Sequence, residues 1–254
     1  MVIVLHGGPA AAGSAAPIAQ GLAGSFRVLE PWQRGRGSEP LTVARHVADV
    51  HDVVLSHGDG GRPALVGESW GAMLALAYAA EHAEAAGPIA LIGCGTFDPA
   101  ARARLRQVLA ERTDENMKRQ LDRLPENVPS AEERLRQRYK LTERLYVYEP
   151  IEGEEEGFKG PLDVRAHEET WADMLRLQEE GVYPAAFAAI ESPVLMLHGD
   201  CDPHPGRMIR DSLAPYLKQL EYHELNRCGH SPWKERFARD EFFDLLRGWL
   251  LKHV

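Results

Sequence analysis

The chain has 254 residues, of which 44% are hydrophobic and 26% charged, and this composition excludes collagen-like, low-complexity and disordered proteins. The net charge of −9 argues against a nucleic-acid or anionic membrane partner, because phosphates are bound by clustered lysines and arginines. We therefore expect the partner to be a small-molecule substrate.

The cysteines and the apolar runs indicate where the protein resides. Cys94, Cys201 and Cys228 are odd in number and have no framework spacing, so we expect no disulfide and a reducing, cytoplasmic environment. The longest apolar run, residues 72–80, is less than half of the roughly 20 residues that a membrane span needs. The amino terminus lacks the basic flank of a signal peptide. We expect a soluble, unprocessed monomer or homodimer.

Short apolar runs that end at glycine or proline alternate with a helical pattern in the first hundred residues. Within residues 42–56, valines recur at helical spacing, which predicts an amphipathic helix. Strand, helix, strand is the order of a βαβ unit with a parallel sheet. The expected strands cover residues 2–5, 26–29, 64–66 and 89–92.

The same order returns near the carboxyl end. Strands are expected at 193–197 and 221–225, and helices at 206–217 and 233–252. Residues 98–190 differ, because 20 acidic and 15 basic residues stand among these 93 and amphipathic helical patterns occur without a convincing strand. We interpret residues 1–97 and 191–254 as an α/β core domain and residues 98–190 as a helical cap inserted in it. The alternative is a solvated helical arm with no role in binding.

Residues 67–71, Gly-Glu-Ser-Trp-Gly, match the pattern G-x-S-x-G directly after a predicted buried strand and at the start of an apolar helix. A sharp turn from strand to helix leaves no room for side chains at the flanking positions, and it holds the serine in a strained conformation above the strand. Ser69 is therefore the candidate nucleophile.

A serine hydroxyl needs a base to take its proton and an acidic group to orient that base. Asp200 and Asp202 follow the strand at 193–197, and His230 lies in the turn between the last strand and the last helix. The order Ser69, Asp202, His230 is typical of one fold. Asp200, which is closer to the strand, is the alternative acid.

Four motifs in this order resemble the α/β-hydrolase superfamily and, within it, the proline iminopeptidase-like branch. His6-Gly7-Gly8-Pro9 is similar to the branch's oxyanion loop, and residues 69–71 to its nucleophile elbow. Gly199-x-x-Asp202 is similar to its acid turn, and Gly229-His230 to its base loop. The chain departs from the pattern at Ala10, Glu68 and the Asp200-Cys201 pair. The resemblance implies an α/β-hydrolase fold whose mostly parallel sheet is reduced to about six strands, because two amino-terminal strands are missing.

The resemblance and the order of the motifs imply a catalytic role for each of three residues. Ser69 attacks a carbonyl carbon, His230 accepts its proton and returns it to the leaving group, and Asp202 fixes the imidazole tautomer. The backbone N–H groups of Gly8 and Trp70 are expected to form the oxyanion hole.

Metal and cofactor sites are not expected. His198, Asp200, Cys201, Asp202 and His204 stand close together in the sequence, but they match no zinc spacing, and their alternation is expected to place neighbours on opposite sides of a loop. The glycine-rich turn at residues 35–38 lacks the spacing of a nucleotide loop.

The resulting hypothesis is a cofactor-independent serine hydrolase that cleaves an ester, amide or similar acyl bond of a small substrate. Alternatives are a lyase or perhydrolase on the same fold, or a ligand receptor. The acidic run at residues 149–156 is a candidate for attracting an amine-bearing substrate. Six residues of the insertion are candidates for a pocket over Ser69: Tyr146, Trp171, Met174, Leu175, Tyr183 and Phe187.

Overall fold

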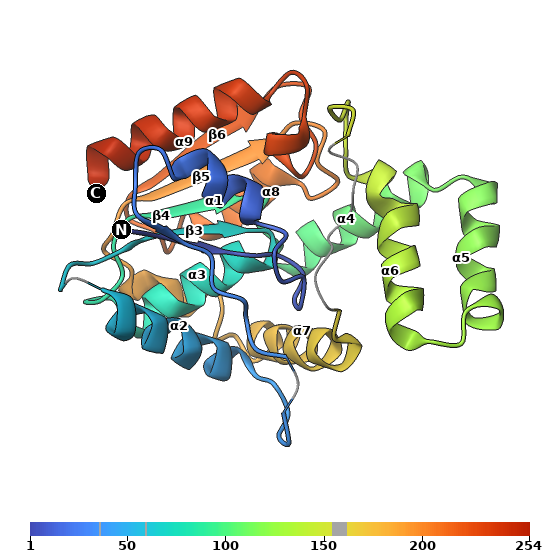
Figure 1. The fold of residues 1–254 in the computed structure, drawn as a ribbon, viewed down its shortest axis with the longest axis horizontal. Helices are drawn as coiled ribbons and strands as arrows, with labels where there is room; N and C mark the ends of the chain where they lie inside the picture. The colour runs from blue at the N-terminus through green and yellow to red at the C-terminus, as the bar shows by residue number, and fades with distance from the viewer. Residues whose placement is uncertain (36, 59, 154–161) are drawn as a thin grey trace.

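A six-stranded parallel sheet forms the centre of the protein, as expected from the sequence (Figure 1). The computed structural model describes residues 1–35, 37–58, 60–153 and 162–254. The strand order is β2-β1-β3-β4-β5-β6. In the register, Gly67 is paired with Leu5 on one side and Leu91 on the other, so three strands end beside the elbow. The strands are β1 (Val2–Leu5), β2 (Val28–Leu29), β3 (Ala64–Glu68), β4 (Ile89–Ile92), β5 (Val194–Gly199) and β6 (Leu220–Leu225).

Helices cover both faces of the sheet, because alternate strand residues are buried on opposite sides. Ile3, Leu65 and Leu91 pack with α2, α3 and α8 in one hydrophobic core. Val4 and Val66 pack with α1 and α9 in the other. These helices are α1 (Ala16–Leu22), α2 (Val43–His57), α3 (Trp70–Glu81), α8 (Gly206–Leu213) and α9 (Arg239–His253).

Two of these helices are shorter than predicted. The helix α8 ends at Leu213, because Pro215 has no N–H to donate and disfavours a helical conformation at the residue before it. The terminal helix α9 begins at Arg239 instead of residue 233. Residues Pro232–Lys234 instead form a 3-10 turn, and the Glu235 carboxylate is bonded to loop amides.

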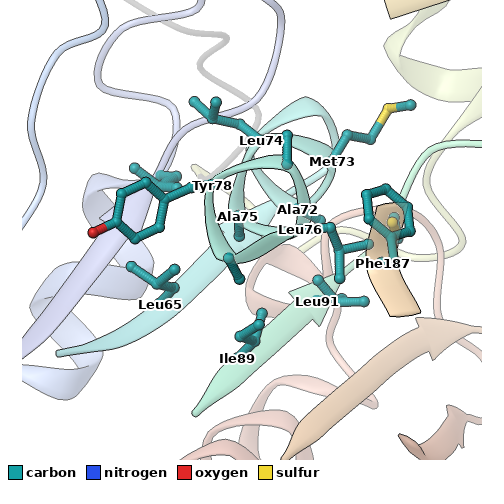
Figure 2. Close-up of a cluster of buried hydrophobic side chains, with 14 of the residues drawn as sticks. Leu65, Ala72, Met73, Leu74, Ala75, Leu76, Tyr78, Ile89, Leu91 and Phe187 are labelled. Atoms are coloured by element: carbon teal, nitrogen blue, oxygen red, sulfur yellow. The ribbon is translucent and has the colours of Figure 1, made fainter. Parts of the chain in front are cut away.

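The helix α3 is buried on nearly all sides (Figure 2). Small residues such as Ala72 and Ala75 allow it to lie close to the sheet, while Phe187, from the end of the insertion, packs against its other side. The Phe187 ring has no exposed surface and stacks on Tyr183 with ring centroids 5.0 Å apart. Helix α3 is thus fixed between the sheet and residues at the end of the insertion.

The insertion between β4 and β5 is helical, as expected, and has no strand among its described residues. Side chains of Asp98, Asp114, Ser130 and Asp163 cap the four α-helices by accepting a backbone N–H. Helices α5 and α6 form a hairpin that extends away from the sheet, and α7 packs beside α2 (Figure 1). The helices are α4 (Pro99–Arg112), α5 (Glu115–Asn127), α6 (Ala131–Thr142) and α7 (Val164–Glu179), with 3-10 turns η1 (Glu143–Leu145) and η2 (Ala185–Ala189).

Among the described helices, none combines the length and the apolar character that a membrane crossing requires.

Replacing Phe187 by alanine tests whether this contact stabilises the core. Because the ring is fully buried, Phe187→Ala is expected to lower the free energy of unfolding by about 3–5 kcal/mol in urea denaturation. The matched control is Phe237→Ala, which removes a ring that is 41% exposed and is expected to change it by less than about 1 kcal/mol. Equal effects of the two substitutions would contradict this account.

Candidate active site

Ser69 lies at a strained turn between β3 and α3, with φ of 54° and ψ of −113°. Non-glycine residues rarely adopt a positive φ, and such strain persists where the surrounding structure enforces it. Both flanking positions require glycine, because the neighbouring backbone leaves no room for a Cβ atom. A Cβ atom at Gly67 would lie 2.3 Å from the carbonyl oxygen of Gly71, and one at Gly71 would lie 2.1 Å from that of Leu5.

His230 and Asp202 come together from the loops that follow β6 and β5. The His230 Nδ1 atom lies 2.7 Å from Asp202 Oδ2. The imidazole lies over Gly93 at the end of β4, where an added Cβ would be 3.0 Å from the ring. Ser69 is anchored to the same strand, because its N–H donates to the carbonyl of Ile92. Ser69 and His230 therefore both lie at the end of β4, although no hydrogen bond joins Ser69 Oγ to His230 within the described chain.

The Asp202 carboxylate is buried and surrounded by three imidazoles. Besides His230, the Nδ1 atom of His204 lies 2.9 Å from Oδ1, and the Nε2 atom of His198 lies 3.2 Å from Oδ2. Burial alone would raise the pKa of Asp202, but the three histidines outweigh burial and hold the pKa well below its ordinary value. The expectation that alternation separates neighbours in this loop is therefore wrong for Asp202 and His204.

The alternative acid, Asp200, has a different partner. Its Oδ1 atom accepts the backbone N–H of Cys228 at 3.0 Å, which ties the acid loop to the base loop. Cys201 and Cys228 are free thiols, and burial raises the pKa of Cys201 to about 11. The geometry favours Asp202 as the partner of His230.

The pKa of His230 is set by two opposing effects. Burial disfavours the imidazolium, but the Asp202 carboxylate attracts it and accepts its hydrogen bond, so that the pKa lies above the ordinary value of 6.5. Only the neutral ring can accept a proton from Ser69.

The loop after β1 has the backbone conformation needed for close approach. Gly8 has φ of 123°, and a Cβ there would be 2.7 Å from the N–H of Ala11. The N–H groups of Gly8 and Trp70 donate to no other group of the described chain, whereas the N–H of Gly7 donates to Glu68 Oε2 at 2.8 Å. Glu68 also accepts the hydroxyl of Ser14 at 3.0 Å, so this buried residue fixes the loop beside the elbow.

Gln33 connects this loop to Trp70, the residue after Ser69. Its backbone N–H donates to His6 Nε2 at 3.0 Å, and its side-chain oxygen accepts the Trp70 indole N–H at 2.8 Å. Sequence reasoning missed Gln33 and Glu68. Glu68 stands inside the motif itself, and a carboxylate at the end of a buried strand is a signal that could have identified its role.

The insertion contacts both sides of the site. The carbonyl of Tyr146 accepts the backbone N–H of His230 at 2.7 Å, and the two rings meet edge to face. The fully buried Glu235 accepts backbone N–H groups of Gly229, Tyr148 and Glu149 at 2.8–2.9 Å. These bonds join residues 146–149, which we call the strap, to the base loop. On the opposite side, His167 Nδ1 lies 3.0 Å from the carbonyl oxygen of Pro9.

The residues expected to form a pocket are placed differently. Met174 and Phe187 are fully buried in the core with α3, so the prediction that they face a pocket over Ser69 is wrong. Tyr183 stacks on Phe187, and Trp171 packs against the same core. Among the six, Tyr146 is the residue in contact with His230.

Comparison with known proteins assigns the family. A family model described as "Alpha/beta hydrolase family" matches residues 2–245, so the chain belongs to this family. Membership supports a hydrolytic enzyme. No curated protein sequence gives a significant match.

Solved structures share the fold at low sequence identity. An esterase from Thermogutta terrifontis is 20% identical, with a TM-score of 0.65 over 100% of this chain and 90% of that chain. The proline iminopeptidase of Mycobacterium smegmatis is 18% identical, with a TM-score of 0.62 over 99% and 89%. A monoacylglycerol lipase from Paleococcus ferrophilus is 18% identical, with a TM-score of 0.60 over 100% and 94%. At this identity they show the fold alone, and the iminopeptidase is one neighbour among several.

The elbow makes a prediction about stability. Gly71→Ala is expected to lower the free energy of unfolding by about 3 kcal/mol or more, because the new methyl group meets backbone that cannot move without displacing β1. Gly248→Ala in α9 is the control, since nothing lies within 4 Å of its added Cβ, and a rise of up to about 1 kcal/mol is expected. Chemical denaturation measures both. An unaffected Gly71→Ala protein would show that the elbow is less crowded than described.

The His230–Asp202 pair makes a prediction about pH. The value of kcat/KM for an ester, measured in EDTA-treated buffer, is expected to rise with pH. The midpoint of this rise is expected above pH 6.5, because the raised pKa of His230 keeps its ring protonated in acid. Asp202→Asn is expected to lower this midpoint and to reduce kcat by about 10⁴-fold. A midpoint that stays in place in Asp202→Asn would contradict the assignment.

Proposed function

We propose that the protein is a cofactor-independent serine hydrolase that cleaves an ester, amide or similar acyl bond of a small substrate. The observation that carries the proposal is the 2.7 Å contact between His230 Nδ1 and Asp202 beside the strained Ser69 elbow. This arrangement supports Ser69 as nucleophile, His230 as general base and acid, and Asp202 as the residue that orients His230.

The chemistry proceeds in two stages in this proposal. The Ser69 oxygen attacks the carbonyl carbon while His230 Nε2 takes the hydroxyl proton, and the proton then passes to the leaving alcohol or amine. Water hydrolyses the acyl-enzyme by the same steps. The N–H groups of Gly8 and Trp70 donate hydrogen bonds to the carbonyl oxygen as it becomes negatively charged. Each such donor contributes roughly 10²–10³ in rate.

The insertion serves as a cap in this proposal, because residues on both of its sides contact the loops of the site. The strap bonds to the base loop, and His167 bonds to the oxyanion loop. An acyl substrate is bound between them. The acidic run gives no clear support for an amine-bearing substrate: Glu149 forms an ion pair with Arg236 at 3.1 Å, and residues 154–156 lie outside the described residues.

Labelling with a fluorophosphonate tests the nucleophile. The probe is expected to modify Ser69 rapidly, as measured by intact mass and peptide mapping, and to leave Ser69→Ala unmodified. His230→Ala is expected to react at least about 10³-fold more slowly, because the base is missing. Ser56→Ala, at an exposed position of α2, is expected to react like the wild type.

Folding of each variant is checked by circular dichroism. A folded wild-type protein whose Ser69 does not react, or a His230→Ala variant that reacts at the full rate, would overturn the proposal. The first outcome would favour a ligand receptor on the hydrolase fold.

A further inference from the structure

Two imidazoles share the carboxylate of Asp202. His230 Nδ1 lies 2.7 Å from one oxygen, and His204 Nδ1 lies 2.9 Å from the other. The two rings are stacked, with centroids 4.6 Å apart and planes inclined by 22°. A serine hydrolase needs one imidazole on this carboxylate, so His204 is not explained by the proposed reaction.

We infer that Asp202, His204 and His230 form a binding site for a divalent transition-metal ion such as Zn²⁺, and that the bound ion inhibits the enzyme. Their ligand atoms all lie within 4.8 Å of one another. Ligands at about 2.1 Å from a tetrahedral ion are about 3.4 Å apart, and ligands at right angles are about 3.0 Å apart. The N–O separations of 2.7 and 2.9 Å must therefore widen by about 0.5–0.7 Å around a tetrahedral ion.

The donor set selects the kind of ion. Two imidazole nitrogens and one carboxylate suit Zn²⁺, Cu²⁺ and Ni²⁺, whereas Mg²⁺ and Ca²⁺ prefer oxygen ligands. The groups behind the carboxylate hold it in place, as is usual around bound metals. His198 Nε2 lies 3.2 Å from Oδ2, and the backbone N–H of His204 donates to Oδ1 at 2.9 Å.

An ion would enter from the side of the two histidines, because the Asp202 side chain itself has no exposed surface. The side chains of His204 and His230 are 13% and 12% exposed. Asp202 and His204 also line a cleft of about 320 Å³, together with Glu224 on β6. Three protein ligands leave positions for water on the ion.

The inhibition follows from the tautomer of His230. An ion between Asp202 and the two rings takes the place of the protons on both Nδ1 atoms. Each ring stays neutral by carrying its one proton on Nε2 instead, so that no proton is lost from the protein. His230 then has no lone pair on the nitrogen that would receive the proton of Ser69. The inhibition rests on the proposed function of the protein. The metal binding does not.

Calorimetry of Zn²⁺ binding to the Ser69→Ala protein tests the site without activity. One Zn²⁺ per chain is expected, with affinity reduced about tenfold or more by adding His204→Phe, which keeps an aromatic ring in the stack and removes the ligand. The matched control adds His57→Phe, at an exposed position of α2, and is expected to bind like Ser69→Ala alone. Absence of binding, or equal binding in the His204→Phe protein, would overturn the site.

Kinetics test the inhibitory consequence. Zn²⁺ is expected to inhibit ester hydrolysis reversibly with EDTA, and the inhibitory concentration is expected to rise at least about tenfold in His204→Phe but not in His57→Phe. Mg²⁺ at the same concentration is expected to have no effect. Inhibition that is equal in His204→Phe, or equal with Mg²⁺, would overturn the inference. If the wild type hydrolyses no ester, calorimetry still decides whether the metal site exists.

Discussion

The buried carboxylate of Asp202 is the constraint on which the candidate site depends. Burying a charged carboxylate away from water is unfavourable in free energy unless several hydrogen-bond donors surround it. Here the donors come from the loop after β5 and from the base loop, so satisfying one carboxylate fixes the relative position of both loops. As a result, Asp202 and His230, which are 28 positions apart in the chain, are held in contact. The same bonds engage Nδ1 of His230 and leave its Nε2 free of Asp202.

The elbow depends on the core in a comparable way. A positive φ at Ser69 is unfavourable in isolation, and it persists because the segments on both sides are fixed. The strand β3 precedes Ser69 and pairs with a neighbouring strand on each edge. The helix α3 follows Ser69 and is buried on nearly all sides. The buried apolar side chains of α3 therefore help to fix the backbone of the elbow.

Much of the fold could be predicted because it depends on local patterns. Apolar runs that end at glycine identify parallel strands, and the spacing of Val43, Val47, Val50 and Val54 identifies α2, which begins one residue after its Thr42 cap. The motif at residues 67–71 identifies the elbow, because its glycines are required by local crowding.

The rest depends on contacts between distant segments, which periodicity does not record. Phe187 has the same apolar character whether it lines a pocket or completes a core, and only the tertiary structure decides between the two. The approach of His204 to Asp202 depends on the backbone path through Pro203, and the start of α9 depends on the bonds of the Glu235 carboxylate. Gln33 reaches Trp70 across 37 residues of sequence, a distance at which a single sequence carries no pairing signal.

Glu235 makes the strap a fixed wall of the candidate site. Its carboxylate accepts amides from the strap and from Gly229, next to His230, so the strap cannot swing outward while the base loop stays in place. The hairpin of α5 and α6 is bound differently, because its main described contacts are with neighbouring parts of the insertion. The insertion therefore has one part that is bonded to the loop carrying His230 and another part, the α5–α6 hairpin, that packs mainly within the insertion itself.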